Sequence, residues 1–174
     1  ALASRSEMTV HVVHDERVAA FITLGLGLES MPGASAAPAL LLCTSGTAAA
    51  NFAPAVVEAG LSEVPMIVLT ADRPEELRGV GAPQTIDQVE LYGGHVTWFH
   101  DARVAQASAA GEWRELAATA WSRSASGPIQ FNLQFREPLV GTPCALPDLI
   151  DPVLEVAAAG PTDVVPDRFD TERG

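Results

Sequence analysis

Five short runs of apolar, β-favouring residues recur along the chain, and each of them predicts a strand. The runs lie at residues 9–13, 39–43, 65–70, 96–100 and 129–134. The stretch Leu40-Leu41-Leu42 is apolar without alternation, a pattern typical of a strand that is covered on both faces in a parallel sheet. We therefore expect a mainly parallel sheet at the centre of the fold.

Between these runs, three segments carry apolar residues at helical spacing and predict helices. They lie at residues 15–28, 47–59 and 112–124. Strands that alternate with helices are typical of α/β domains, in which helices cover both faces of the sheet. The pattern therefore predicts an α/β domain of three layers, with a mainly parallel central sheet flanked by helices.

Residues 72–92 interrupt this alternation, because Pro74, Gly79, Gly81 and Pro83 break up any continuous helix or strand. The segment follows a predicted strand, and in such sheets ligands bind at the carboxyl ends of the strands. We expect a long loop here that takes part in binding.

The composition changes after Gly141, where prolines punctuate an acidic stretch. We expect residues 1–141 to form the domain, and residues 142–174 to be a Pro-rich acidic linker or tail toward a middle domain. A first strand and helix, usual before the run at 9–13 in such a sheet, are missing or reduced. Both ends suggest a piece of a longer protein, in which the domain lacks its extreme N-terminus.

Composition narrows the range of partners. The 174 residues include 10 Arg, no Lys and 22 acidic residues, and the net charge is −12. This acidity argues against nucleic acid or an anionic membrane as partner, and the lack of Lys excludes a P-loop lysine or a Schiff base. No apolar run approaches the ~20 residues of a spanning helix. Because the chain has only two cysteines, Cys43 and Cys144, which stand far apart, we expect no disulfide framework and a cytoplasmic location.

The histidines do not suggest a metal site. No two of them stand at metal-ligand spacing on a predicted helix, and no carboxylate is placed to complete a ligand set. The four are His11, His14, His95 and His100. We expect no metal ligands in this chain.

The first candidate cluster, Val13-His14-Asp15-Glu16-Arg17, stands at the junction of a predicted strand and an apolar helix. In one interpretation Asp15 caps the helix and Glu16 complements the helix dipole. In the other, Glu16 is covered by another subunit and works as a buried carboxylic acid. The pattern alone leaves both interpretations open.

The second cluster, Cys43-Thr44-Ser45-Gly46-Thr47, joins a predicted strand to a helix with small polar residues. Gly46 permits a tight turn, and free N–H groups at a helix start could hold an anion or the edge of a polar ring. An ordinary cap by Ser45 or Thr47 is the alternative.

The third cluster places Arg73 at the end of a predicted strand, beside a Gly-rich loop that contains Gln84. A guanidinium in that position can bind a carboxylate through two parallel hydrogen bonds. The alternative is a surface ion pair between Asp72 and Arg73 with little energetic consequence.

Together and in this order, the motifs resemble the pyrimidine-binding domain of thiamine-diphosphate enzymes. The similarity spans about residues 10–141, and within the family it is greatest to the carboligases of menaquinone biosynthesis. The motifs that carry it are His14-Asp15-Glu16-Arg17, Thr44-Ser45-Gly46-Thr47-Ala48 with Asn51, Glu58-Ala59-Gly60-Leu61, Thr70-Ala71-Asp72-Arg73-Pro74, Gly81-Ala82-Pro83-Gln84 and Phe135-Arg136-Glu137-Pro138-Leu139.

The resemblance implies roles for these residues. Glu16 matches the catalytic Glu that hydrogen-bonds N1′ of the cofactor's aminopyrimidine and exchanges a proton with it. Thr44, Ser45 and Gly46 would line the cofactor's approach. Arg73 and Gln84 match residues that bind the anionic substrates 2-oxoglutarate and isochorismate, of which the first is decarboxylated and its succinyl carbanion is added to the second.

The resemblance also implies groups outside this chain. Thiamine diphosphate and Mg²⁺ would be held mainly by a domain that the chain lacks, since no G-D-G…N segment is present. The pyrophosphate-binding domain of a partner subunit would close over Glu16, in a homodimer or homotetramer. We therefore expect the isolated chain to be inactive and to bind thiamine diphosphate weakly.

Two further departures concern the substrate site. Ser4-Arg5-Ser6 lies too close to Glu16 to be the family's upstream substrate loop, and Pro83 stands where an amide side chain commonly precedes the Gln. Two alternatives remain, namely another carboligase of the family, similar to acetolactate synthase, and a truncated binding module without catalysis.

Overall fold

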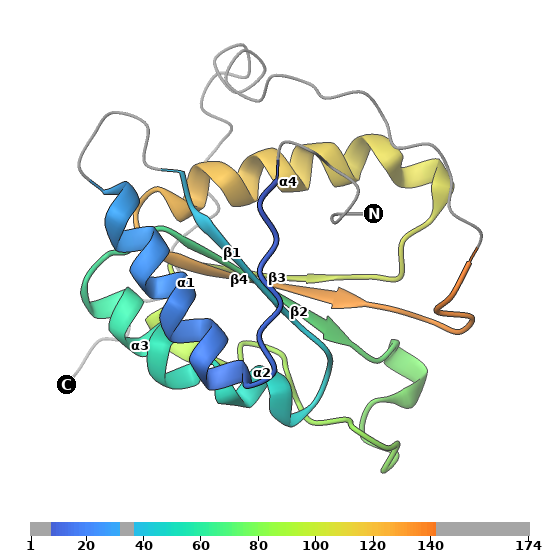
Figure 1. The fold of residues 1–174 in the computed structure, drawn as a ribbon. Coiled ribbons are helices and arrows are strands. Elements are labelled where there is room, and N and C mark those ends of the chain that lie inside the picture. Colours follow the sequence, from blue (N-terminus) through green and yellow to red (C-terminus); the bar gives the residue numbers. More distant parts are fainter. Residues whose placement is uncertain (1–7, 32–36, 142–174) are drawn as a thin grey trace, which may run out of the picture.

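The computed structural model describes residues 8–31 and 37–141 (Figure 1). In this part of the chain four strands form one parallel sheet in the order β1-β2-β4-β3. The strands are β1 (Ala39–Cys43), β2 (Met66–Asp72), β3 (Trp98–Ala102) and β4 (Pro128–Gln134). Four of the five predicted strands are thus confirmed to within two residues at either end, and the parallel sheet with them.

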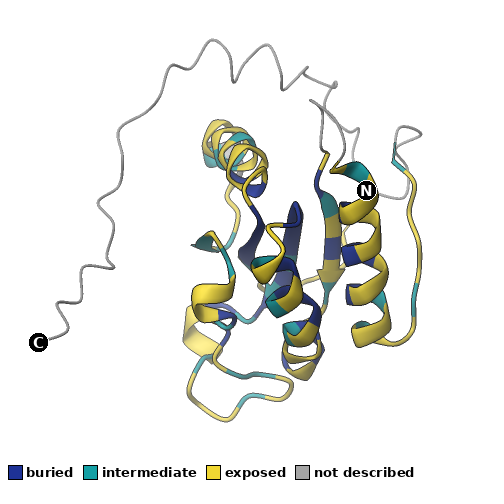
Figure 2. Ribbon diagram, turned by 90° about the vertical axis from the view of Figure 1, so that its left-hand side faces the viewer, coloured by how far each residue is buried: buried dark blue, intermediate teal, exposed yellow. Residues whose placement is uncertain are grey.

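Helices cover both faces of this sheet, as Figures 1 and 2 show. Their bounds are α1 (Glu16–Ser30), α2 (Thr47–Asn51), α3 (Ala53–Leu61) and α4 (Ala110–Ser124), with short 3-10 turns at Glu75–Leu77, Gly93–His95 and Ala107–Ala109. Side chains of α1 and α3 bury Met66 and Val68 of β2, whereas α4 packs over Ile129 and Phe131 of β4. The predicted three-layer α/β architecture is confirmed.

The start of α1 follows from its sequence. The Asp15 side chain accepts a hydrogen bond from the backbone N–H of Val18 at 2.9 Å, and Glu16 occupies the first turn. The predicted capping role of Asp15 is confirmed, and Glu16 lies where a negative charge complements the helix dipole. Further along, Gly27 allows a close approach, since a Cβ there would lie 2.6 Å from Val64.

The prediction of a single helix at 47–59 is wrong in one respect, because the structure has two helices, α2 and α3, divided at Phe52. Pro54 has no N–H to donate to the carbonyl of Ala50, so the regular hydrogen-bond ladder cannot pass through this point. Phe52 itself is fully buried and anchors the break in the core.

The strand expected at 9–13 is also wrong. These residues form no ladder with any other described strand, and the side chains of Val10 and Val12 are 49% and 85% exposed. The segment has strand propensity, but propensity without a neighbouring strand and a face to bury does not make a strand.

Candidate functional site

The carboxyl end of β1 lies beside the start of α1. The Glu16 side chain is half-buried there, and it is close enough to Cys43 for their charges to interact. Burial raises the pKa of the Cys43 thiol to about 12, and the Glu16 carboxylate adds to this rise. The thiol is therefore protonated at neutral pH and inert as a nucleophile, which leaves Glu16 as the ionisable group at this corner.

The turn after β1 is built around Gly46, which has φ +82° and is the N-cap residue of α2. No side chain caps α2, so the alternative of a cap by Ser45 or Thr47 is wrong. Instead the buried Ser45 hydroxyl donates to the main-chain oxygen of Gln84 at 3.0 Å. A Cβ on Gly46 would lie 3.0 Å from that same oxygen, so the left-handed glycine is required both for its φ and for the contact.

Gln84 completes this contact from the other side. Its side-chain amide donates to the Thr44 hydroxyl at 3.0 Å and to the Ser45 carbonyl at 3.1 Å. Gln84 and Thr44 are both exposed, whereas Ser45 is buried. Four of the candidate residues from two distant segments, Thr44, Ser45, Gly46 and Gln84, are thus brought together.

Arg73 follows β2 and reaches toward the same loop. Its guanidinium donates to the main-chain oxygen of Pro83 at 3.3 Å, next to Gln84. No carboxylate among residues 8–31 and 37–141 forms an ion pair with Arg73. The alternative of a surface pair between Asp72 and Arg73 is therefore wrong, because Asp72 is only 3% exposed and pairs with Arg78 instead.

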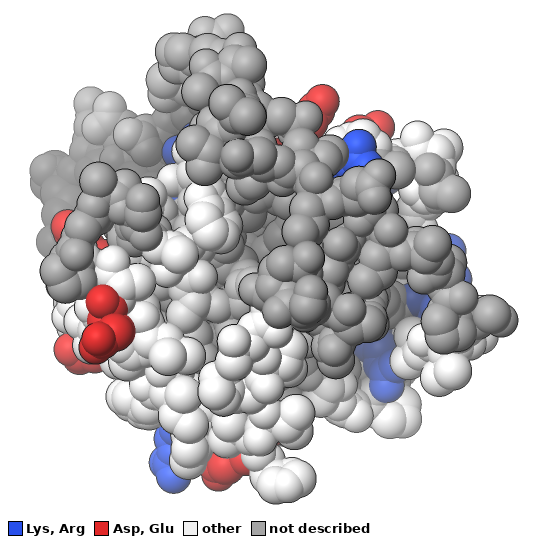
Figure 3. Space-filling model, turned by 45° about the horizontal axis from the view of Figure 1, so that its top comes forward, with Lys and Arg blue, Asp and Glu red and all other residues white. Residues whose placement is uncertain are grey.

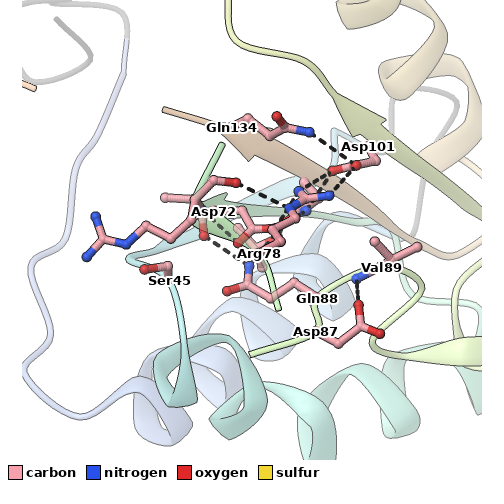
Figure 4. Close-up of polar contacts among 12 residues, drawn as sticks. Ser45, Asp72, Arg78, Asp87, Gln88, Val89, Asp101 and Gln134 are labelled. Atoms are coloured by element: carbon pink, nitrogen blue, oxygen red, sulfur yellow. Dashed lines mark hydrogen bonds and ion pairs between the residues drawn. The ribbon is translucent and has the colours of Figure 1, made fainter. Parts of the chain in front are cut away.

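A buried polar network that the sequence analysis missed lies behind this loop (Figure 4). Arg78 forms ion pairs with Asp72 and with Asp101 at the end of β3. The side-chain amide of Asn132, on β4 between them, donates to both carboxylates at 2.8 Å. Asn132 is completely buried and Asp72 almost so, whereas the side chains of Arg78 and Asp101 are 22% and 25% exposed. The two negative charges thus share one cation and one amide at the boundary between the core and the surface.

Gln88 connects this network to the turn after β1. Its side-chain oxygen accepts the backbone N–H of Gly46 at 2.7 Å. Its nitrogen donates to the Ala71 carbonyl and to Asn132, both at 3.0 Å. Because Gln88 is only 1% exposed, these contacts fix the turn to the sheet without competition from water.

The charges in the network stabilise one another. Burial alone would raise the pKa of Asp101, but the donors Arg78, Asn132 and Gln134 outweigh it and hold that pKa below its usual value. Hydrogen bonding to Asp101, with the two negative charges, raises the pKa of Arg78 despite burial. Both shifts favour the charged forms of Asp101 and Arg78.

One sequence signal could have revealed this network. In Pro128–Gln134 the polar residues Gln130, Asn132 and Gln134 alternate with apolar ones. Amides at every second position of a central strand place one polar stripe on a face that is covered, and such groups require partners. The side-chain oxygen of Gln130 is the one buried polar atom of the described residues without a partner.

A cavity of about 730 Å³ lies elsewhere, between the end of β3 and α4. Its lining includes His100, Arg103 and Trp113, and none of the candidate residues. The His100 ring stacks on Trp98 at 5.5 Å between centroids, and burial lowers the pKa of His100 against the opposing effect of Asp101. The cavity is thus on the far side of the sheet from Thr44 and Gly46.

Charged side chains are few and scattered on the described surface visible in Figure 3. Among the residues that the structure describes, no three His, Cys, Asp or Glu side chains lie close enough together to hold a metal ion. In the same residues no helix has the length and apolar character that a membrane crossing requires.

Comparison with known proteins found a matching family and related sequences. Residues 1–91 match the family described as "Thiamine pyrophosphate enzyme, N-terminal TPP binding domain". The 2-succinyl-5-enolpyruvyl-6-hydroxy-3-cyclohexene-1-carboxylate synthase of Thermobifida fusca is 48% identical over 152 residues, which are 84% of this chain and 27% of that protein. The synthase of the same name from Bacillus pumilus is 50% identical over 84% of this chain and 24% of that protein. The chain thus spans about a quarter of the length of these relatives.

Proposed function

Since the chain belongs to the thiamine pyrophosphate enzymes, through their N-terminal TPP-binding domain, we propose that it is part of a 2-succinyl-5-enolpyruvyl-6-hydroxy-3-cyclohexene-1-carboxylate synthase. The whole protein would be a cytoplasmic transferase that decarboxylates 2-oxoglutarate and adds the succinyl group to isochorismate. The observation that carries the proposal is the meeting of the turn at 44–46, Gln84 and Arg73 at the carboxyl ends of β1 and β2, in a chain about half identical to the named synthases.

The residues at this edge fit the aminopyrimidine half of thiamine diphosphate. The half-buried Glu16 carboxyl stands at one side of the site, and the turn at Gly46, packed against Gln84, stands at the other. A carboxyl group and small polar residues are the donor and acceptor set that a flat, polar heterocycle needs. Thr44, Ser45 and Gly46 would line the cofactor, which supplies a nucleophilic thiazolium carbon when bound.

Glu16 would hold the proton at the pyrimidine nitrogen. This task requires a carboxylic acid that is removed from water, and the chain itself buries Glu16 only in part. The rest would come from the pyrophosphate-binding domain of a partner subunit. Exposed apolar side chains on α1, among them Val18, Phe21 and Ile22, support a partner there, since contiguous apolar surface marks interfaces.

Arg73 and Gln84 would bind the substrates. Both proposed substrates are dianions, and a guanidinium without an acidic partner among the described residues is available for a carboxylate. Gln84 offers its exposed side chain from the opposite loop. Mg²⁺ and the diphosphate would be held by a domain outside this chain, in a homodimer or homotetramer.

The test is turnover by the full-length protein. With thiamine diphosphate and Mg²⁺ it should convert 2-oxoglutarate and isochorismate, and Glu16→Gln should reduce kcat by about 10²–10⁴-fold, the range typical of general acid–base catalysis. Glu29→Gln, at the far end of α1, is the matched control and should retain activity. Turnover of pyruvate alone, or an unaffected Glu16→Gln variant, would contradict the proposal.

A further inference from the structure

Arg78 is held beneath the loop that carries Arg73, and all three of its side-chain nitrogens are used. Nη1 and Nη2 donate to the two oxygens of Asp101 at 2.7 and 2.9 Å, and Nη2 also contacts Asp72. Nε donates in another direction, to the main-chain oxygen of Arg73 at 3.2 Å. Arg78 therefore joins two carboxylates, of which Asp72 is buried, to the backbone of another arginine.

The backbone of Arg73 is fixed at both of its polar groups. Its N–H donates to Oδ1 of Asp72 at 2.7 Å, and its carbonyl accepts from Arg78. The Asp72 carboxylate is itself held by Asn132. The same network thus holds the peptide groups on either side of the Arg73 Cα, while the Arg73 side chain extends over the loop to the main-chain oxygen of Pro83.

We propose that Arg78 is a positioning residue for Arg73. It touches no substrate in this scheme, and it acts by fixing the main chain from which the Arg73 guanidinium projects. The proposal rests on the proposed function only in that Arg73 binds a substrate carboxylate. Two parallel hydrogen bonds to a carboxylate require a defined position and plane of the guanidinium, and a displacement of about 1 Å can cost about a hundredfold.

A purely structural role makes a different prediction. If Arg78 only neutralised Asp72 and Asp101, any cation at this position would suffice. Lysine supplies the charge, but it has one nitrogen in place of the rigid fork and cannot span both carboxylates and the Arg73 carbonyl. Arg78→Lys therefore separates neutralisation of charge from positioning of the loop.

The kinetic experiment uses the full-length enzyme. Arg78→Lys should raise the KM of the carboxylate substrate bound by Arg73 by about 10–100-fold, with a smaller change in kcat and an unchanged Kd for thiamine diphosphate. Arg136→Lys is the matched control, because Arg136 also forms two hydrogen bonds to a carboxylate, that of Glu76, but is exposed. It should leave KM unchanged.

A double variant tests whether Arg78 acts through Arg73. In an Arg73→Met background, Arg78→Lys should change KM by less than about twofold, because the group that it positions is gone. Effects that multiply in the double variant, or a wild-type KM in Arg78→Lys alone, would overturn the proposal.

Hydrogen exchange tests the positioning role of Arg78 without relying on the activity under the proposed function. In the substrate-free full-length protein, amides of residues 73–84 should exchange faster in Arg78→Lys than in wild type or Arg136→Lys. Should Arg78→Lys fail to fold, Arg78→Gln combined with Asp101→Asn removes one charge of each sign and should show the same loosening. Unchanged exchange overturns the positioning role, whereas a wild-type enzyme that is inactive on both substrates overturns only the proposed function.

Discussion

The carboxyl end of β1 lies next to the carboxyl ends of the other three strands, β2, β4 and β3. The two regions differ in how far their polar side chains are buried and hydrogen-bonded. At β1, Thr44 and Gln84 are exposed, and the half-buried side chain of Glu16 makes no hydrogen bond to any other described residue. At the neighbouring strands, Asp72 and Asn132 are almost wholly buried and every one of their side-chain polar atoms has a partner. The first region leaves polar side chains exposed to solvent, and the second uses its polar groups to hold the first in place.

The largest loss of stability should follow from Asn132→Leu. The substitution leaves the Thr70 hydroxyl, Gln88 and the two carboxylates without their shared amide. Burying such groups unpaired should lower the free energy of unfolding by about 3 kcal/mol. Denaturant unfolding followed by tryptophan fluorescence measures this, and Asn51→Leu on the exposed face of α2 is the control, with a change within about 0.5 kcal/mol.

A smaller effect is expected from Gly46→Ala, at the boundary of the two regions. An L-residue at φ +82° is strained, and its Cβ would press on Gln84, so the loss should be about 1–2 kcal/mol. Gly94→Ala is the control, since no atom lies within 4 Å of a Cβ there and its φ is not positive. Equal stability of the two variants would show that the turn is not tightly held.

The contribution of Asp101 to stability should depend on pH, which gives a further test of the comparison. Its pKa is lowered in the folded chain from the ordinary 3.8, so its contribution to stability is present above that value and is lost as the pH falls through the lower folded pKa. Asp101→Asn should be less stable than wild type at pH 7, and the difference should shrink as the pH falls below about 4. Unfolding midpoints at several pH values measure it; a difference that stays constant would contradict the assignment.

The smallest effect should come from Thr44→Val. The Thr44 hydroxyl accepts from Gln84 at an exposed position, where water can replace the lost partner. We expect a change in the free energy of unfolding within about 0.5 kcal/mol. A loss as large as that of Asn132→Leu would remove the distinction between the two regions.

The sequence predicts the layers of this fold because its strongest local signals agree with the final packing. The apolar run Leu40–Leu42 and the capped start of α1 at Asp15 both lead to the correct elements. The run at 9–13 fails for the opposite reason, since its propensity finds no partner strand among the described residues. Whether a strand forms is decided by its neighbours, which a local pattern does not contain.

The same distinction applies to the site. The motifs predicted Arg73 and Gln84, and the structure brings both to one loop region beside Thr44. The pairing of Arg78 with Asp101 and that of Asn132 with Asp72 were missed because the partners stand 23 and 60 residues apart in the chain. Such pairings depend on the order of strands in the sheet, and a single sequence does not give that order. The roles of Glu16, Thr44, Ser45, Gly46, Arg73 and Gln84 remain predictions.

The strand order has a consequence for biosynthesis. β4 is made after the other three strands, yet it lies between β2 and β3. On the ribosome, β3 therefore cannot pair with β4, its only described neighbour, until the segment through Gln134 has emerged. At ordinary elongation rates this takes a few seconds. During this interval Trp98 and Ile67 lack the apolar cover that β4 later provides. Nascent chains paused before Pro128 are expected to depend most on chaperones.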